Sequence, residues 1–196
     1  MPNNKMTFRV SSYGFSLLEL MVAIAVIAVL SAFAFPSFQV TLQNNRLINK
    51  TNDIVAAINI ARQTAISRGL VTFVCHSNNA DTATPTCDGG TNSNWNTGVI
   101  IYSAPERTIV AAQRDYAAST DALVQQFDFA DDDQITFTQA NDNDYIAFSG
   151  NGLLFTAGAT EDALSFTICD DRTAESGRTV NVSLAGRIST VEATCT

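Results

Sequence analysis

Residues 14–35 read GFSLLELMVAIAVIAVLSAFAF, and this stretch decides what kind of protein the chain is. Between Phe15 and Phe35 the only charged side chain is that of Glu19. As an α-helix these residues would extend roughly 31 Å, close to the hydrocarbon thickness of a bilayer. We therefore predict that residues 15–35 form a helix that crosses a membrane once.

A short basic segment precedes the apolar run. Lys5 and Arg9 lie before it, whereas Arg46 and Lys50 follow only after a flank rich in Gln and Asn. Positive residues favour the cytoplasmic side, so the remainder of the chain is expected to cross the membrane. A secretory signal is cut after its apolar core, but here the small residue Gly14 lies before it. We expect residues 1–14 to be a cleaved leader that leaves the helix on the mature chain.

Glu19 needs a reason to lie in the apolar run. An acid in a bilayer costs roughly 2.5 to 3.5 kcal/mol on insertion scales and usually has a partner or a function. The α-amino group of a neighbouring subunit could pair with Glu19, and such a pair would set the axial register of a polymer. The alternative is that Glu19 lies close enough to the interface for its carboxylate to reach water.

Residues 36–69 continue as an amphipathic helix. The segment after Pro36 contains no proline, and its apolar residues recur at helical spacing, as in Leu47, Ile54, Ile58, Ala61 and Ala65. This stripe is predicted to pack on a sheet rather than to bind a partner. Arg68 in the last turn and Gly69 after it indicate where the helix ends.

Residues 70–196 have the period of strands. Residues 71–75 and 98–102 are short apolar runs, and alternation is present at Leu164, Phe166 and Ile168 and at Val180, Val182 and Leu184. Turn-rich segments, 77–96 and 140–144, separate them. The pattern predicts an α+β protein in which a long N-terminal helix packs on one antiparallel β-sheet domain.

Charge and cysteine content limit the function classes. The net charge is −8, and loss of the leader would leave nine basic against nineteen acidic residues, or −10. Such a field opposes phosphate binding, so nucleic acid is an unfavourable partner. The four cysteines suggest an oxidising compartment. Three pairings exist; the one with the shortest loops joins Cys75 to Cys87 and Cys169 to Cys195.

The N-terminal residues carry a family resemblance. Residues 14–20, GFSLLEL, resemble the G-F-[ST]-L-[LI]-E-L signature of type IV pilins and type II secretion pseudopilins. The resemblance implies cleavage between Gly14 and Phe15 by a prepilin peptidase, N-methylation of Phe15, and pairing of Glu19 with a neighbouring Phe15 amine. It also implies that Pro36 kinks the helix, as a ring without an N–H does.

Further matches narrow the resemblance to the GspH/FimT/FimU branch of minor pilins and pseudopilins, which implies a type IV pilin-like fold. They lie in five segments: residues 59–69 with 71–75, Trp95–Gly98 as a W-x-x-G turn, Phe148–Gly152, Thr167–Asp170, and Gly186-Arg187. The acidic segment 115–144 matches no part of that pattern.

The sequence contains no strong catalytic, cofactor-binding or metal-binding motif. His76 is the only histidine, and no G-x-S-x-G or phosphate-binding glycine loop occurs, so neither enzyme activity nor a cofactor is expected. Cys75, His76 and Cys87 lack a fourth ligand at zinc-finger spacing. Residues 131–133 and 141–144 are rich in oxygen ligands, but they do not follow a calcium-loop pattern. We predict no metal site.

Gly186-Arg187 resembles the start of a G-R-x-R element associated with DNA capture in FimT-type minor pilins. Ser189 stands where the second arginine would be, and Arg178 is the candidate for a second charge across the hairpin. Arg178 and Arg187 are therefore the candidate DNA contacts, on a chain whose charge opposes them.

Three functions follow from the resemblance. The first is a FimU/FimT-like minor pilin that acts in the initiation and tip complex of a type IV pilus. The alternatives are a GspH-like pseudopilin of a type II secretion system and a DNA-binding minor pilin. The implied partners are other minor and major pilins or pseudopilins, the prepilin peptidase and the inner-membrane assembly platform. The implied location is the bacterial inner membrane, with the C-terminal domain in the periplasm.

Overall fold

The computed structural model describes residues 14–88, 95–104, 116–129, 135–139, 145–155, 164–172 and 176–195. The chain divides into two compact units, residues 1–42 and 43–196. One helix, α1 (Leu17–Arg68), runs through both units, and all described strands belong to the second.

Helix α1 ends where the sequence predicts and begins two residues later than predicted. Its last residue is Arg68, and Gly69 follows with a φ of 64°, donating its N–H to the carbonyl of Ala65 at 2.9 Å. A glycine takes this left-handed conformation without steric cost, which makes it a common helix stop. At the other end Phe15 lies outside the helix because Ser16 serves as its N-cap.

The second unit contains two antiparallel sheets, whereas one was predicted. The five-stranded sheet has the order β3-β2-β1-β5-β6, and the four-stranded sheet has the order β4-β7-β8-β9. The strands of the first are β1 (Val71–His76), β2 (Gly98–Ala104), β3 (Ala122–Asp128), β5 (Tyr145–Phe148) and β6 (Leu154–Phe155). Those of the second are β4 (Ile135–Gln139), β7 (Leu164–Asp170), β8 (Ser176–Val182) and β9 (Ile188–Thr194).

One predicted strand position is wrong. Leu184 was expected to continue the alternation of Val180 and Val182, but it lies in a turn and is exposed. The chain reverses there, with Gly186 donating its N–H to the carbonyl of Ser183 at 2.8 Å. Gly186 has a φ of 72°, which closes the turn between β8 and β9.

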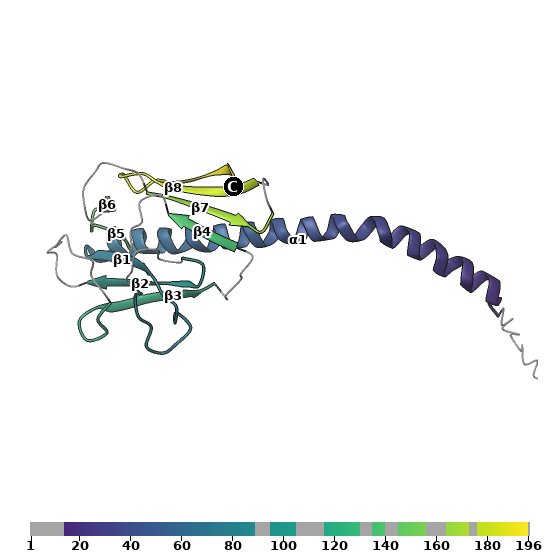
Figure 1. Cartoon of the computed structure of the whole chain (residues 1–196). Helices are drawn as coiled ribbons and strands as arrows, with labels where there is room; N and C mark the ends of the chain where they lie inside the picture. The colour runs from purple at the N-terminus through teal and green to yellow at the C-terminus, as the bar shows by residue number, and fades with distance from the viewer. Residues whose placement is uncertain are drawn as a thin grey trace, which may run out of the picture. The chain divides into compact units, whose positions relative to one another are not determined.

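The main core forms between α1 and both sheets of the second unit (Figure 1). The predicted apolar stripe of the helix is buried in full, and the residues facing it come from both sheets: Val74, Val99, Ile101, Ile146, Phe148, Phe166, Ile168, Val180 and Val182. The prediction that this stripe packs on sheet rather than on a partner is confirmed.

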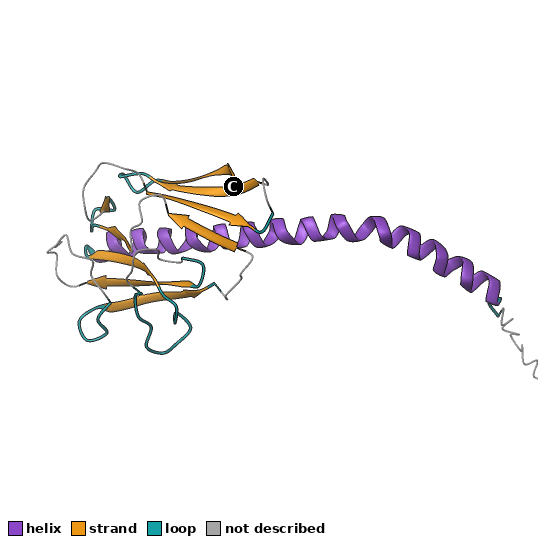
Figure 2. Cartoon of the chain, viewed as in Figure 1, coloured by secondary structure: helices purple, strands orange, loops and turns teal. Residues whose placement is uncertain are grey.

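A second apolar cluster covers the other face of the five-stranded sheet. It contains Phe73, Cys75, Ile100, Tyr102 and Tyr145, with Cys87 and Tyr116 packed against it. Strands β1 and β2 are therefore buried on both faces, which explains their continuous apolar runs. Strand β7 alternates between buried and partly buried residues instead, because only one of its faces packs on the core. Figure 2 shows the strands in orange and the described loops in teal.

Trp95 and Gly98 fix the start of β2. Trp95 is fully buried and lies edge-on to Phe166, with ring centroids 5.2 Å apart. A Cβ at Gly98 would lie 2.8 Å from the carbonyl oxygen of Phe127 and 2.9 Å from Cβ of Ala80. The W-x-x-G spacing thus places a bulky anchor in the core and a residue without a side chain at a close crossing.

Candidate assembly surfaces

The N-terminal motif forms a capped helix start in the first unit. The Glu19 N–H donates to Oγ of Ser16 at 3.1 Å, and the Leu20 N–H donates to the Ser16 carbonyl at 3.2 Å. Ser16 and Glu19 have the S-x-x-E spacing of a capping box, and an acid in the first turn favourably opposes the helix dipole. Sequence reasoning assigned Glu19 but missed Ser16, although the spacing was visible.

The described side chains of residues 15–30 are all exposed in the first unit. They include Phe15, Leu17, Leu18, Met21, Ile24 and Ile27. The Glu19 carboxylate has no hydrogen-bond or ion-pair partner among the described residues. Among those residues no helix combines the length and hydropathy that a membrane crossing requires. Pro36 lies within α1 in a stretch whose side chains are not described, and the kink expected there stays a prediction.

An arginine missed by sequence reasoning joins the helix to two turns. Arg62 of α1 donates from Nε to the Gly152 carbonyl at 3.1 Å and from Nη2 to the Ala185 carbonyl at 3.2 Å. The sequence clue to this role was that the charged Arg62 directly follows Ala61, a buried residue of the apolar stripe. Charged donors to carbonyls form stronger hydrogen bonds than neutral ones, so Arg62 ties both turns to the end of α1.

This contact also explains Gly186. A Cβ at Gly186 would lie 2.5 Å from Nε of Arg62 and would overlap the carbonyl oxygen of Gly152. The glycine is therefore required by the crossing of two turns with the helix. Its presence beside Arg187 has a structural cause that is independent of nucleic acid.

The two candidate DNA contacts do not lie together. Arg178 is on β8 opposite Glu192, and its Nη1 lies 3.6 Å from Oε1 of that residue. Arg187 lies opposite Ser183, which follows the end of β8 and is five residues beyond Arg178, or about 17 Å at strand spacing. The expectation that Arg178 adds a nearby charge to Arg187 is wrong, because the hairpin register separates them.

Both predicted disulfides are present. Cys75 is joined to Cys87 and Cys169 to Cys195, with Cα–Cα distances of 5.7 and 5.8 Å. Because no cysteine of the described chain is free, Cys75 and Cys87 have no thiolate to offer zinc. The acidic segments weighed for calcium, 131–133 and 141–144, lie outside the described residues.

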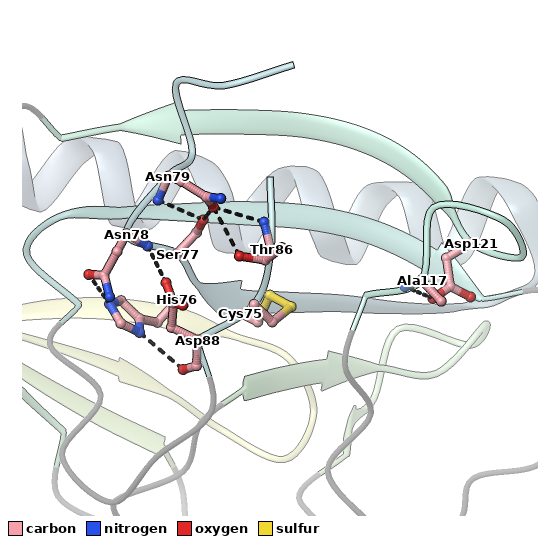
Figure 3. Close-up of a disulfide and its surroundings, with 10 residues drawn as sticks. Cys75, His76, Ser77, Asn78, Asn79, Thr86, Asp88, Ala117 and Asp121 are labelled. Atoms are coloured by element: carbon pink, nitrogen blue, oxygen red, sulfur yellow. Dashed lines mark hydrogen bonds between the residues drawn. A yellow bond between two sulfur atoms is a disulfide. The ribbon is translucent and has the colours of Figure 1, made fainter. Parts of the chain in front are cut away.

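A polar network around the buried His76 fixes the loop closed by Cys75–Cys87 (Figure 3). The His76 ring places Nδ1 3.3 Å from the Asp88 carbonyl and Nε2 3.2 Å from both Asn78 Oδ1 and Thr97 Oγ1. Asn79 Oδ1 accepts the Thr86 N–H at 2.8 Å. His76 thus has a structural role here, with both ring nitrogens engaged.

The second disulfide lies beside a polar contact with the helix. Arg172 pairs with Asp170 and donates from Nη2 to Asn44 Oδ1 at 2.9 Å, and Gln43 Nε2 donates to Asp171 Oδ1 at 3.4 Å.

Further along α1, burial raises the pKa of Asp53 although the charge of Lys50 acts to lower it. Asp53 is therefore an acid that the fold desolvates without full compensation.

Comparison with known proteins identifies the family. Residues 50–186 match the family model described as type II transport protein GspH, and residues 9–35 match the prokaryotic N-terminal methylation motif. No curated protein matches the chain significantly.

Two solved structures are similar, both crystal forms of the type IV minor pilin FimU of Pseudomonas aeruginosa. Each is 20% identical to the chain. The form in space group P21 covers 75% of this chain and 89% of its own, with a TM-score of 0.49. The form in P65 covers 69% and 85%, with a TM-score of 0.42. By its family match and its methylation motif, the chain belongs to the GspH family of the minor pilin and pseudopilin class.

Proposed function

We propose that the chain is a minor subunit of a type IV pilus, of the FimU/FimT kind, that acts in the initiation and tip complex. Residues 1–14 are a leader removed by a prepilin peptidase, residues 15–35 hold the subunit in the inner membrane and then in the filament, and residues 36–69 complete the helix. Residues 70–196 form the periplasmic domain.

The observation that carries the proposal is the helix start. The largely apolar residues 15–30 expose their side chains, and Glu19 within them has no described partner, while Ser16 caps the first turn. Apolar surface of this extent is stable only when lipid or neighbouring helices cover it. A carboxylate in such surroundings requires a cation, and the freed amine of Phe15 on an adjacent subunit supplies one.

Mass spectrometry of the native protein tests the processing step. The mature chain should begin at Phe15 with one added methyl group on its amine. Any other N-terminus contradicts the assignment of Gly14 and Phe15.

Substitution of Glu19 tests the assembly step. Glu19→Ala should leave the chain in the membrane fraction and reduce its entry into sheared filaments at least about tenfold, because an unpaired amine would then be buried. Glu192→Ala is the matched control, since it removes an exposed acid of β9. Equal incorporation of the two variants would contradict the pairing role of Glu19.

A second candidate is a pseudopilin of a type II secretion system. The matched family model, described as type II transport protein GspH, favours it. Deletion of the gene separates the two candidates: loss of surface pili with normal protein export supports the pilus, and blocked export with normal pili supports secretion. The separation of Arg178 from Arg187 gives the DNA-binding alternative no support.

A further inference from the structure

Three segments meet at one end of the second unit. They are the last turns of α1, residues 149–153 before β6, and residues 183–187 between β8 and β9, which lie near one another in Figure 1. Arg62 bonds to both turns, and the Leu154 N–H donates to the Leu184 carbonyl at 2.9 Å. The two turns are thus held rigidly on the helix end.

The same segments expose three large apolar side chains. Ile66 is 50% exposed, Leu153 47% and Leu184 43%. Outside α1, the described part of the second unit exposes only two other large apolar side chains, Leu123 on β3 and Val191 on β9. Of the four exposed large apolar side chains outside α1, two therefore lie on these turns, and Ile66 of the helix lies beside them.

The charge of this end differs from that of the chain. The segments 62–69, 149–153 and 183–187 contain three arginines and no acidic residue, on a chain of net charge −8. Arg62 and Arg68 donate to described acceptors, whereas the exposed guanidinium of Arg187 has no partner among the described residues. One cation is thus available beside the apolar side chains.

We propose that Ile66, Leu153, Leu184 and Arg187, here named the turn surface, bind another filament subunit through an apolar side chain flanked by carboxylates. The inference rests on the proposed function, because it names the surface by which the minor subunit contacts its neighbour. Apolar contact provides the attraction, and Arg187 selects partners of negative charge. Arg62 acts as a positioning residue for both turns.

Other occupants fit the turn surface less well. Two copies of this chain related by a twofold axis would place Arg187 near Arg187, which is repulsive. A nucleic acid would gain little from three apolar side chains and one cation, against the field of an acidic chain. A partner subunit with carboxylates around an apolar residue matches both the chemistry and the charge.

The test places a photo-crosslinking amino acid, p-benzoylphenylalanine, at Leu184 of the full-length chain in cells that assemble the filaments. The matched control has it at Val191, which is 49% exposed on β9 of the same unit. Irradiation should join position 184 to a second pilin-class subunit at least about fivefold more than position 191. The crosslinked peptide, mapped by mass spectrometry, should contain Asp or Glu within a few residues of the attachment point.

Charge variants complete the test. Arg187→Glu should lower the adduct from position 184 by about threefold to fivefold, Arg187→Lys should retain it, and neither should alter thermal stability because the side chain is exposed. An adduct with a copy of this chain, an adduct with DNA, or a yield no higher than at Val191 would overturn the inference.

The presence or absence of the wild-type chain in sheared filaments distinguishes a failure of the turn-surface proposal from a failure of the proposed function. If it enters filaments but position 184 gives no subunit adduct, the turn surface alone is wrong. If it never enters filaments, the proposed function fails and the inference fails with it.

Discussion

Replacement of Gly186 by alanine should destabilise the second unit more than the addition of one methyl group to a turn suggests, because Gly186 is buried. A positive φ costs a residue with a side chain about 1–2 kcal/mol. The added Cβ would also overlap the Gly152 carbonyl and lie 2.5 Å from Nε of Arg62. Overpacking of this kind costs about 1–3 kcal/mol more, because the turn or the arginine must move. We expect Gly186→Ala to lower the melting temperature by about 5–15 °C.

Gly69 provides the matched control. Its φ is 64°, and nothing lies within 4 Å of the Cβ it would gain, so Gly69→Ala isolates the backbone cost. Unfolding of the detergent-solubilised chain can be followed through the fluorescence of Trp95, which is fully buried. In an Arg62→Ala background the Gly186→Ala change should cost less, since the crowding atoms of Arg62 are gone and the Gly152 carbonyl oxygen remains. A Gly186→Ala variant no less stable than Gly69→Ala would refute the close-approach reasoning.

Three further predictions follow from local contacts. Removing the Cys169–Cys195 disulfide should cost about 3.6 kcal/mol and removing Cys75–Cys87 about 2.9 on the chain-entropy model, so denaturant titration should find the first loss larger. Ser16→Ala should weaken the helix start by about 1 kcal/mol and Ser16→Asp should retain it, with amide exchange near the first turn as the measurement. Because burial raises the pKa of Asp53, the folded state binds more protons than the unfolded state between pH 3.8 and the higher folded pKa, so stability falls as pH rises through that interval. Asp53→Asn should raise the melting temperature at pH 7 and have little effect well below pH 3.8, where Asp53 is protonated in both states.

Periodicity predicted the helix and its buried face because both depend on local chemistry. Leu47, Ile54 and Ile58 recur at helical spacing, and Gly69 follows the last turn, so neither the helix nor its end needed tertiary information. The start differed from prediction because hydropathy does not distinguish Phe15 from Leu17, whereas the Ser16 hydroxyl does.

The division into two sheets lay beyond sequence reasoning. Apolar runs show that β1 and β2 are buried, but which strands pair is decided by contacts between distant residues, such as Thr72 with Phe148 and Phe137 with Ile168. The same limit applies to Arg62, whose acceptors lie 90 and 123 residues away. Leu184 was misplaced because alternation of apolar residues continues by chance into a turn that glycine closes.

The burial of Cys75 within the second apolar cluster makes the reduction rate of its disulfide a measure of how open the neighbouring loop is. Cys75 is only 2% exposed and Cys87 is partly buried, so a thiol reagent in solution reaches this disulfide mainly through the sulfur of Cys87, in the loop held by the His76 network. The rate of reduction therefore reports how accessible Cys87 is, and it should rise when the loop opens. Filament contacts that cover this loop would lower the rate of disulfide reduction, so reduction kinetics could compare the free and the assembled subunit without any added label.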